Sequence, residues 1–202
     1  MKIECFESKL FEENTYIVSD KGDCFIVDPG MQGEDFFATL NKHNLKFILL
    51  THGHIDHTIG LKNLHFETYI LDKEKRVFSS HEDSLYALYN LKSPYDDISS
   101  KIKYLKDGDI INFASHQIKV IETPGHTAGS CCYLLDNIYL FTGDTLFNCS
   151  VGRTDLPTGN EQSLKKSLDK LMNLSNQITI YPGHGDKSNI AFEKKNNPFI
   201  KK

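Results

Sequence analysis

The densest group of reactive side chains in the sequence lies in the segment Thr51–His57, which reads Thr-His-Gly-His-Ile-Asp-His. In an extended segment, residues two apart face the same way, so His52 and His54 are able to bind one metal ion together. The side chains of Asp56 and His57 diverge from that pair and are placed to reach a second ion beside the first. Burying four such side chains within six residues is costly unless something compensates them. The segment therefore predicts a metal site.

Three further segments each carry one potential ligand after a strand-like run, where functional loops gather. They are Thr-Pro-Gly-His-Thr with His126, Thr-Gly-Asp-Thr with Asp144, and Tyr-Pro-Gly-His-Gly with His184. Seven side chains exceed the roughly four or five ligands of one zinc ion, so the sequence predicts two divalent ions. We expect one ion on His52, His54 and His126, the other on Asp56, His57 and His184, and Asp144 with a hydroxide bridging both. The imidazole and carboxylate donors suit zinc first, with iron and manganese as alternatives.

The chemistry that such a two-ion centre favours is hydrolysis. Two divalent cations with two carboxylates and one hydroxide keep a net charge of about +1, which attracts anionic substrates. Metal binding lowers the pKa of water to about 7, and the ions also stabilise the oxyanion of a tetrahedral intermediate. Hydrolysis of an ester-like bond is therefore expected, and a good leaving group such as a thiolate would need no separate proton donor. We assign Asp56 as the catalytic carboxylate as well as a ligand.

Arg153 is the candidate for holding an anionic group of the substrate. A guanidinium group forms bidentate hydrogen bonds with carboxylates, and Arg153 follows Asp144 closely in the chain. The alternative is that Arg153 pairs with Asp155 or a backbone carbonyl and braces the loop. Asp144 and His184 have an alternative too, as turn residues. Histidines outside the motifs are interpreted as ordinary surface or core side chains: His43, His65, His81 and His116.

The elements that must position these residues are short strands and a few helices. The strand-like runs are bounded by turn signals such as Asp-Pro-Gly at 28–30. The predicted strands are 2–6, 15–19, 24–27, 47–50, 68–71, 109–113, 117–122, 131–135, 138–142 and 179–181. The predicted helices are 34–43, one near Ile59, 82–91 and 163–172. Strands and helices in both halves predict two mixed sheets flanked by helices, an αββα sandwich of the α/β class.

Length and composition bound the remaining possibilities. The 202 residues have a net charge of −4, with 39% hydrophobic and 25% charged residues, which is typical of one globular domain spanning 1–202. The one basic cluster is a tail with Lys194, Lys195, Lys201 and Lys202, so we expect no nucleic-acid partner. No apolar run is long enough for a membrane and no signal peptide is recognisable, so we expect a cytoplasmic protein with reduced, mostly buried cysteines. The oligomeric state stays open.

The four ligand segments, in this order and with these residue types, resemble the metallo-β-lactamase superfamily and especially its short glyoxalase II-like branch. The resemblance runs from about residue 11 almost to the end. It implies an αββα fold, a dinuclear metal centre and hydrolysis of thioesters such as acylglutathiones. The larger enzymes of that branch carry a C-terminal helical extension that helps to bind glutathione, whereas only 18 residues follow His184 here. The resemblance therefore does not imply that this chain recognises glutathione.

Two other functions stay open at this point. The Gly-Arg-Thr-Asp run at 152–155 is similar to persulfide dioxygenases of the superfamily, which use one iron held by the counterparts of His52 or His54, His126 and Asp144. Retention of Tyr-Pro-Gly-His-Gly with His184 favours the dinuclear hydrolase instead. The second alternative is a non-catalytic metal-binding module. It is disfavoured because a structural zinc site is closed by about four ligands, whereas this set leaves room for a reactive water.

Overall fold

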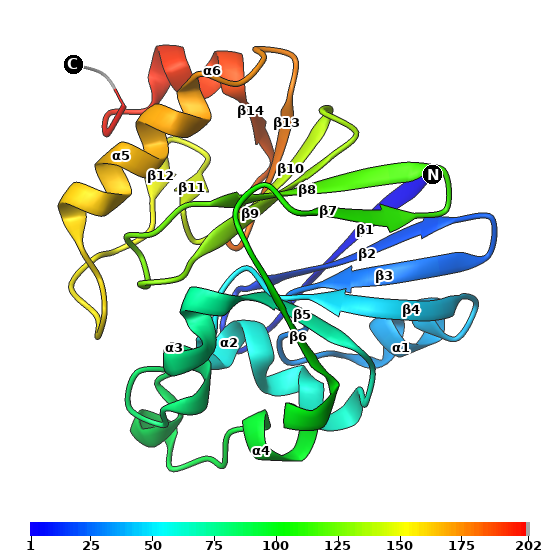
Figure 1. The fold of residues 1–202 in the computed structure, drawn as a ribbon. Coiled ribbons are helices and arrows are strands. Elements are labelled where there is room, and N and C mark those ends of the chain that lie inside the picture. Colours follow the sequence, from blue (N-terminus) through cyan, green and yellow to red (C-terminus); the bar gives the residue numbers. More distant parts are fainter. Residues whose placement is uncertain (201–202) are drawn as a thin grey trace.

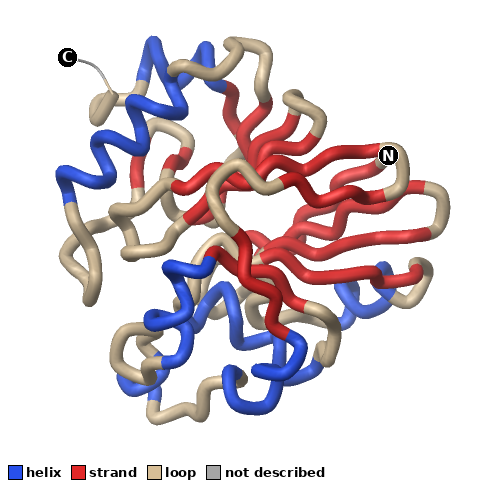
Figure 2. The backbone as a smooth tube through the Cα atoms, viewed as in Figure 1, coloured by secondary structure: helices blue, strands red, loops and turns tan. Residues whose placement is uncertain are grey.

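The architecture consists of two β-sheets packed face to face, with helices on both outer faces (Figure 1). The computed structural model describes residues 1–200. Lys201 and Lys202, which belong to the predicted basic tail and to the predicted 1–202 domain, lie outside the described residues. In Figure 2 the strands fill the middle of the molecule and the helices flank them. The prediction of an αββα sandwich of two mixed sheets is confirmed.

The first sheet contains six strands in chain order. They are β1 (Lys2–Glu7), β2 (Asn14–Asp20), β3 (Asp23–Val27), β4 (Asn44–Leu49), β5 (Thr68–Leu71) and β6 (Ile102–Leu105). The first three strands pair antiparallel, and β3 to β6 run parallel. Parallel neighbours need crossover connections. These contain α1 (Glu34–Leu40), α2 (Ile55–Thr58), α3 (Lys75–Ser79) and α4 (Tyr95–Ile98), together with the 3-10 turns η1 (Ile59–Asn63), η2 (Asp72–Glu74), η3 (Tyr86–Tyr89) and η4 (Ser99–Lys101).

The second sheet has the strand order β14-β13-β10-β9-β8-β7. Its strands are β7 (Ile110–Phe113), β8 (His116–Glu122), β9 (Cys131–Leu135), β10 (Tyr139–Gly143), β13 (Thr179–Pro182) and β14 (Ser188–Asn189). All neighbours are antiparallel except β10 and β13, which run parallel. A small ribbon of β11 (Leu146–Phe147) and β12 (Ser150–Val151) follows β10. Helices α5 (Glu161–Met172) and α6 (Ile190–Asn196) pack on this sheet.

Three apolar layers hold the sandwich together. On β2, Tyr16 and Val18 face the layer between the sheets, while Ile17 faces the helices of the first sheet. Side chains alternate across a strand, so a strand buried on both faces is a continuous apolar run. The buried leucines of α5 recur at helical spacing and pack against the second sheet: Leu164, Leu168 and Leu171.

The main departure from the predicted elements lies at 82–91, where the predicted helix is wrong. Only the turn η3 forms there, between Leu85 and Asn90, whose φ angles are +68° and +51°. A right-handed helix cannot pass through residues in the left-handed region. Strand β6 was not predicted. Its first and last residues are buried and its two middle residues are exposed, so it lacks the alternation of buried and exposed side chains that is typical of a strand. Helix α5 starts at Glu161, ahead of the predicted position, because Asn160 Oδ1 accepts a hydrogen bond from Ser163 N–H at 2.8 Å.

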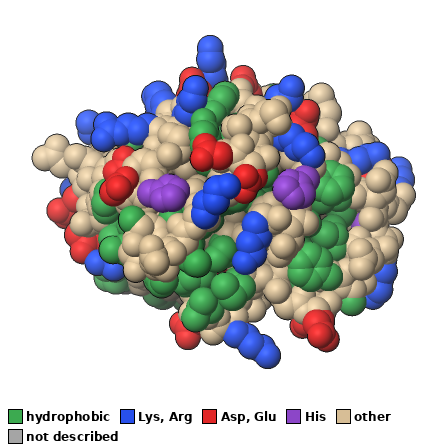
Figure 3. All heavy atoms as spheres, turned by 90° about the horizontal axis from the view of Figure 1, so that it is seen from below, with side chains coloured by type: hydrophobic (Ala, Val, Ile, Leu, Met, Phe, Trp, Pro, Cys, Tyr) green, Lys and Arg blue, Asp and Glu red, His purple; other side chains and the backbone are tan. Residues whose placement is uncertain are grey.

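The surface carries side chains of every type. Figure 3 shows the face seen from below, where acidic and basic side chains are interspersed with apolar patches. Among residues 1–200, no helix is both long enough and apolar enough to cross a membrane. All five cysteines are free thiols, and three of them are buried: Cys24, Cys131 and Cys132.

Candidate metal centre

The seven predicted ligands meet at the edge of the sandwich where four strands end. His52 and His54 lie in the loop after β4, and Asp56 and His57 lie in α2, which begins directly after His54. The other three follow strands of the second sheet: His126 after β8, Asp144 directly after β10, and His184 after β13. The fold therefore brings together side chains that are up to 132 positions apart in the chain.

Three overlapping groups of these side chains bring their donor atoms within 4.8 Å of one another. The groups are His52, His54 and His126; His52, His57 and Asp144; and Asp56, His57 and His184. The first and third coincide with the two predicted ligand sets. Asp144 faces both, since its Oδ1 is 3.3 Å from His57 Nε2 and its Oδ2 is 3.4 Å from His126 Nε2. A bridging carboxylate has to occupy such a position.

Polar partners orient the rings of four of the five histidines. The partners of Nδ1 are the Arg153 carbonyl for His126 (2.8 Å), the Glu12 carbonyl for His184 (2.9 Å), Asp28 Oδ2 for His57 (3.1 Å) and Thr51 Oγ1 for His52 (3.1 Å). A ring that donates its Nδ1–H to such a group presents the lone pair of Nε2 to the centre, as metal-binding histidines do. His54 differs, because its Nδ1 lies 3.0 Å from His126 Nε2.

The cluster also contains most of the buried polar atoms that lack a partner. Within residues 1–200, six buried side-chain nitrogen and oxygen atoms have no hydrogen-bond partner. Four of them belong to the cluster: Nε2 of His52, His54 and His57, and Oδ1 of Asp144. Buried polar groups are nearly always hydrogen-bonded, so unpartnered nitrogen and oxygen atoms gathered in one place need another partner. The residues fit a divalent metal ion.

Burial and charge act differently on the individual donors of the cluster. Burial lowers the pKa of His52 well below its usual range and that of His54 to about 3, so both rings are neutral at neutral pH. Burial also lowers the pKa of His57, but the carboxylates of Asp56 and Asp144 outweigh this effect and raise it well above its usual value. Although burial raises the pKa of Asp144, His57 and its neighbours hold it well below the usual carboxyl range. Neutral imidazoles and ionised carboxylates are metal-binding forms, so His52, His54 and Asp144 are ready to bind, whereas His57 has to release a proton when an ion binds.

A cavity of about 370 Å³ opens beside the ligands. Part of its wall is apolar, formed by Leu85, Phe147, Val151 and Leu156. Arg153 also lines it, but its Nε and Nη2 donate to Asp155 Oδ1 and Oδ2 at 2.7 and 2.6 Å. The structure thus shows the loop-bracing ion pair that the sequence left as the alternative, and binding of substrate by Arg153 stays a prediction.

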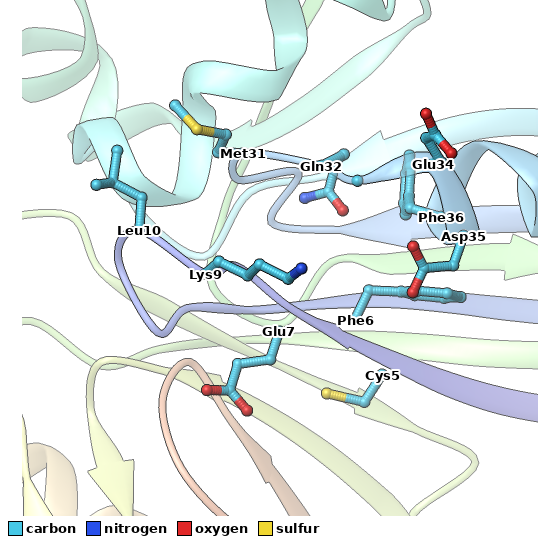
Figure 4. A pocket seen from close by; sticks show the side chains of 11 residues that line it. Cys5, Phe6, Glu7, Lys9, Leu10, Met31, Gln32, Glu34, Asp35 and Phe36 are labelled. Atoms are coloured by element: carbon cyan, nitrogen blue, oxygen red, sulfur yellow. The ribbon is translucent and has the colours of Figure 1, made fainter.

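A larger cavity of about 620 Å³ lies elsewhere, between β1 and the start of α1. Figure 4 shows Lys9 within it, with Glu7 on one side and Glu34 and Asp35 at the start of α1. None of the seven predicted ligands lines this cavity. The smaller cavity is therefore the better candidate for the active site, because the donor atoms converge there.

Two buried carboxylates behind the ligands escaped the sequence analysis. Asp28 accepts hydrogen bonds from the N–H and Oγ1–H of Thr51 at 2.7 and 2.6 Å, and it faces His57. Its Asp-Pro-Gly context predicted only a turn, although a carboxylate directly after a buried strand is placed like the ligands themselves. Glu74 is fully buried and accepts a hydrogen bond from Gly53 N–H at 2.9 Å. Its Asp-Lys-Glu context looks like exposed surface and gives no such signal.

A sandwich of this kind, with histidines and carboxylates converging at one edge, defines a class of metal-binding hydrolase folds. The chain belongs to the metallo-β-lactamase superfamily, whose family profile matches residues 9–184. It is 32% identical over 212 residues to hydroxyacylglutathione hydrolase GloC of Haemophilus influenzae, and the alignment covers 99% of this chain and 98% of that protein.

Solved structures of similar proteins agree with this assignment. The crystal structure of the B3 metallo-β-lactamase BLEG-1 has a TM-score of 0.82 and 26% identity, and all of both chains is covered. The crystal structure of TTHA1623 in a di-iron-bound form has a TM-score of 0.79 and 27% identity, and 97% of this chain and 99% of that chain are covered. The superfamily binds divalent metals, and the cluster described above offers the donors for them.

Proposed function

We propose that the protein is a metal-dependent hydrolase that uses two divalent ions, zinc in the first place, to cleave a small thioester of the acylglutathione type. The observation that carries the proposal is the convergence of four unpartnered buried donor atoms in two three-ligand groups that Asp144 joins. Similarity to a hydroxyacylglutathione hydrolase over nearly the whole chain supports the thioester. The di-iron form of a similar structure supports two ions and keeps iron as the alternative metal.

In this proposal the ligands fall into two sets. His52, His54 and His126 hold one ion, and Asp56, His57 and His184 hold the other, with Asp144 facing both. Bound divalent ions supply Lewis acidity and lower the pKa of water to about 7. The remaining contributions come from the protein, which orients four of the rings through their Nδ1 partners and keeps His52 and His54 neutral and Asp144 ionised.

The open side of the cluster indicates where the substrate reacts. The side chains of Asp56 and His184 are 20% and 28% exposed, whereas that of His57 is fully buried. A substrate carbonyl therefore approaches over Asp56 and His184. As the ligand carboxylate that solvent reaches more easily, Asp56 is placed to orient the attacking water and to accept its proton. This role gives a specific step to the residue that the sequence assigned as catalytic.

The cavity beside the ligands suits a small acyl group with an anionic neighbour. Its apolar wall at Leu85 and Leu156 can contact the acyl chain, and its volume of about 370 Å³ limits the size of that chain. The pair between Arg153 and Asp155 is 62% and 67% exposed. Exposed ion pairs of this kind contribute little to stability, because solvent screens them. A substrate carboxylate can therefore replace Asp155 at Arg153 at little cost.

The test is a measurement of bound metal per chain, followed by assays of acylglutathione hydrolysis and of oxygen uptake with glutathione persulfide. We expect two divalent ions per chain and thioester cleavage that a chelator abolishes and zinc restores. His54→Ala should lose this activity with the fold intact. The matched control is His116→Ala, since His116 pairs with Asp136 and belongs to none of the ligand groups. One iron per chain with oxygen uptake and no thioester cleavage would refute the proposal in favour of a dioxygenase.

A further inference from the structure

Behind the ligand loops lies a carboxylate that the proposed mechanism does not use. Glu74 ends the turn η2 after strand β5, and its side chain is fully buried. All its hydrogen-bond partners are neutral groups. Charged carboxylates are rarely buried without a cation, because moving the charge from water into the protein interior, where the dielectric constant is low, costs roughly several kcal/mol. The hydrogen bonds to Glu74 therefore have to compensate the cost of burying its carboxylate.

The three hydrogen bonds of Glu74 connect two separate ligand loops. Its Oε1 accepts from Gly53 N–H at 2.9 Å, and its Oε2 accepts from Thr127 Oγ1–H at 2.9 Å and from Gly129 N–H at 2.8 Å. Gly53 separates the first two histidines of the ligand segment, and Thr127 directly follows His126. One carboxylate thus holds both loops that supply the three-histidine set.

The backbone around Glu74 leaves these loops little room to move. A Cβ added at Gly129 would lie 2.2 Å from the backbone nitrogen of Glu74. A Cβ added at Gly53 would lie 2.9 Å from the Cα of Phe78 in α3. Both loops therefore rest directly on the segment that runs from η2 into α3. The carboxylate fixes their position on that segment.

The second ligand set is held by different residues. Asn14 Nδ2–H donates to the carbonyls of Pro182 and Gly185, at 3.1 and 2.8 Å, and so holds the loop that carries His184. His57 is oriented by Asp28, as described above. None of the hydrogen bonds of Glu74 reaches these groups. Glu74 therefore supports only the three-histidine set. Asp28, by contrast, reaches both sets, because Thr51 links it to His52.

We propose that Glu74 is a positioning residue that sets the affinity of His52, His54 and His126 for their ion and leaves the other ligand set unaffected. The inference rests on the proposed function, because it requires both sets to bind metal. Losing an acceptor at position 74 leaves a buried N–H of a ligand loop unpaired, so the loop shifts. Changes of this kind behind a metal ligand lower metal affinity by about 10- to 100-fold.

Three variants separate this role from a general effect on the fold. Glu74→Gln keeps the size of the side chain but places an amide NH₂ against N–H or O–H donors. Thr127→Val removes one of the three hydrogen bonds and keeps the carboxylate, so it stays informative if the first variant does not fold. Asn14→Ala is the matched change for the other set. The readouts are zinc titration against a chromogenic chelator, the visible spectrum of the cobalt-loaded protein, and circular dichroism with thermal unfolding of the metal-free protein.

We expect Glu74→Gln to weaken one of the two zinc dissociation constants by about 10- to 100-fold and to leave the other within about threefold. The weakened constant should be the one that His126→Ala abolishes. Thr127→Val should weaken the same constant less, and Asn14→Ala should weaken the other.

Other outcomes overturn the role of Glu74. Equal changes in both constants, no change in either, or loss of the fold in both Glu74→Gln and Thr127→Val would show that the carboxylate acts on the whole fold or not at all. If the wild-type protein binds two ions and only the variants behave otherwise than expected, the proposed function stands and this inference fails. A wild-type protein that binds no divalent metal overturns both.

Discussion

The substitution Gly183→Ala places a single carbon atom inside the ligand cluster. A Cβ on Gly183 would lie 2.3 Å from Asp144 Oδ1 and 2.8 Å from His57 Cε1, whereas ordinary van der Waals contact begins at 3.4 Å. The loop cannot relax outwards easily. The N–H of Gly183 donates to the carbonyl of Gly143 at 2.9 Å, and its own carbonyl accepts from Asn14 N–H at 2.7 Å. The new methyl group therefore displaces Asp144 and His57.

The size of the effect follows from these distances. The carboxylate oxygen of Asp144 has to move by about 1 Å, and a displacement of this size at a reacting centre lowers the rate by about 100-fold. Because Asp144 faces both ligand sets, metal binding should weaken at both. Overpacking by one methyl group costs about 1–3 kcal/mol of stability, so the variant should still fold.

The assay compares thioester hydrolysis, metal content and thermal unfolding of Gly183→Ala with those of Gly33→Ala. Position 33 is the control because a Cβ there meets only Asp35 Oδ1, at 3.4 Å, and lies outside the cluster. We expect the control to stay within about twofold of wild-type activity. Wild-type hydrolysis and metal content in Gly183→Ala would refute the packing of the centre described here.

Three further predictions concern the supports of the centre and of the fold. Asp28→Asn replaces an acceptor of Thr51 and His57 by a donor, so zinc affinity should fall by about 10- to 100-fold in a chelator titration, and an unchanged affinity would contradict the role of Asp28. Asn160→Ala removes the N-cap of α5 and should cost about 1 kcal/mol in urea denaturation with activity retained; a loss of activity would count against this assignment. Burial raises the pKa of Glu74 from 4.5 to about 7. Between these pH values the folded protein keeps a proton that the unfolded chain has lost, so the free energy of unfolding of the metal-free protein should fall as pH rises, by up to about 3 kcal/mol from this group. Glu74→Gln should lack this component, and parallel pH profiles of the two proteins would rule it out.

Much of the fold was predictable because the strands carry their signal locally. The predicted strand at 131–135 coincides with β9, since Cys131–Leu135 is apolar throughout and bounded by turn residues. The candidate ligands were recognisable for a related reason. The segment Thr51–His57 was recognisable by itself, because four metal-ligand side chains lie within six residues after an apolar run. His126, Asp144 and His184 were assigned because they occur together with it.

The residues that support the ligands could not be predicted, because their signal lies in distant contacts. Glu74 meets Thr127 and Gly129 only after folding, 53 and 55 positions along the chain. Nothing near Glu74 in the sequence distinguishes it from an exposed glutamate. The wrong helix at 82–91 has a comparable cause, since Leu85 packs against the cluster of Ile55, Ile59 and Tyr86 in a left-handed conformation that its sequence does not suggest.

The contact between the start of β2 and the His184 loop has a consequence for folding order. His184 Nδ1 lies 2.9 Å from the carbonyl of Glu12 across 172 positions of sequence, and Glu13 forms an isolated β-bridge with His184. Strand β13 reaches its place only by inserting beside β10, in a parallel pairing that local contacts cannot nucleate. During synthesis the second sheet therefore keeps an unpaired edge at β10 until β13 has emerged. The complete set of ligands therefore forms only after both sheets have packed together.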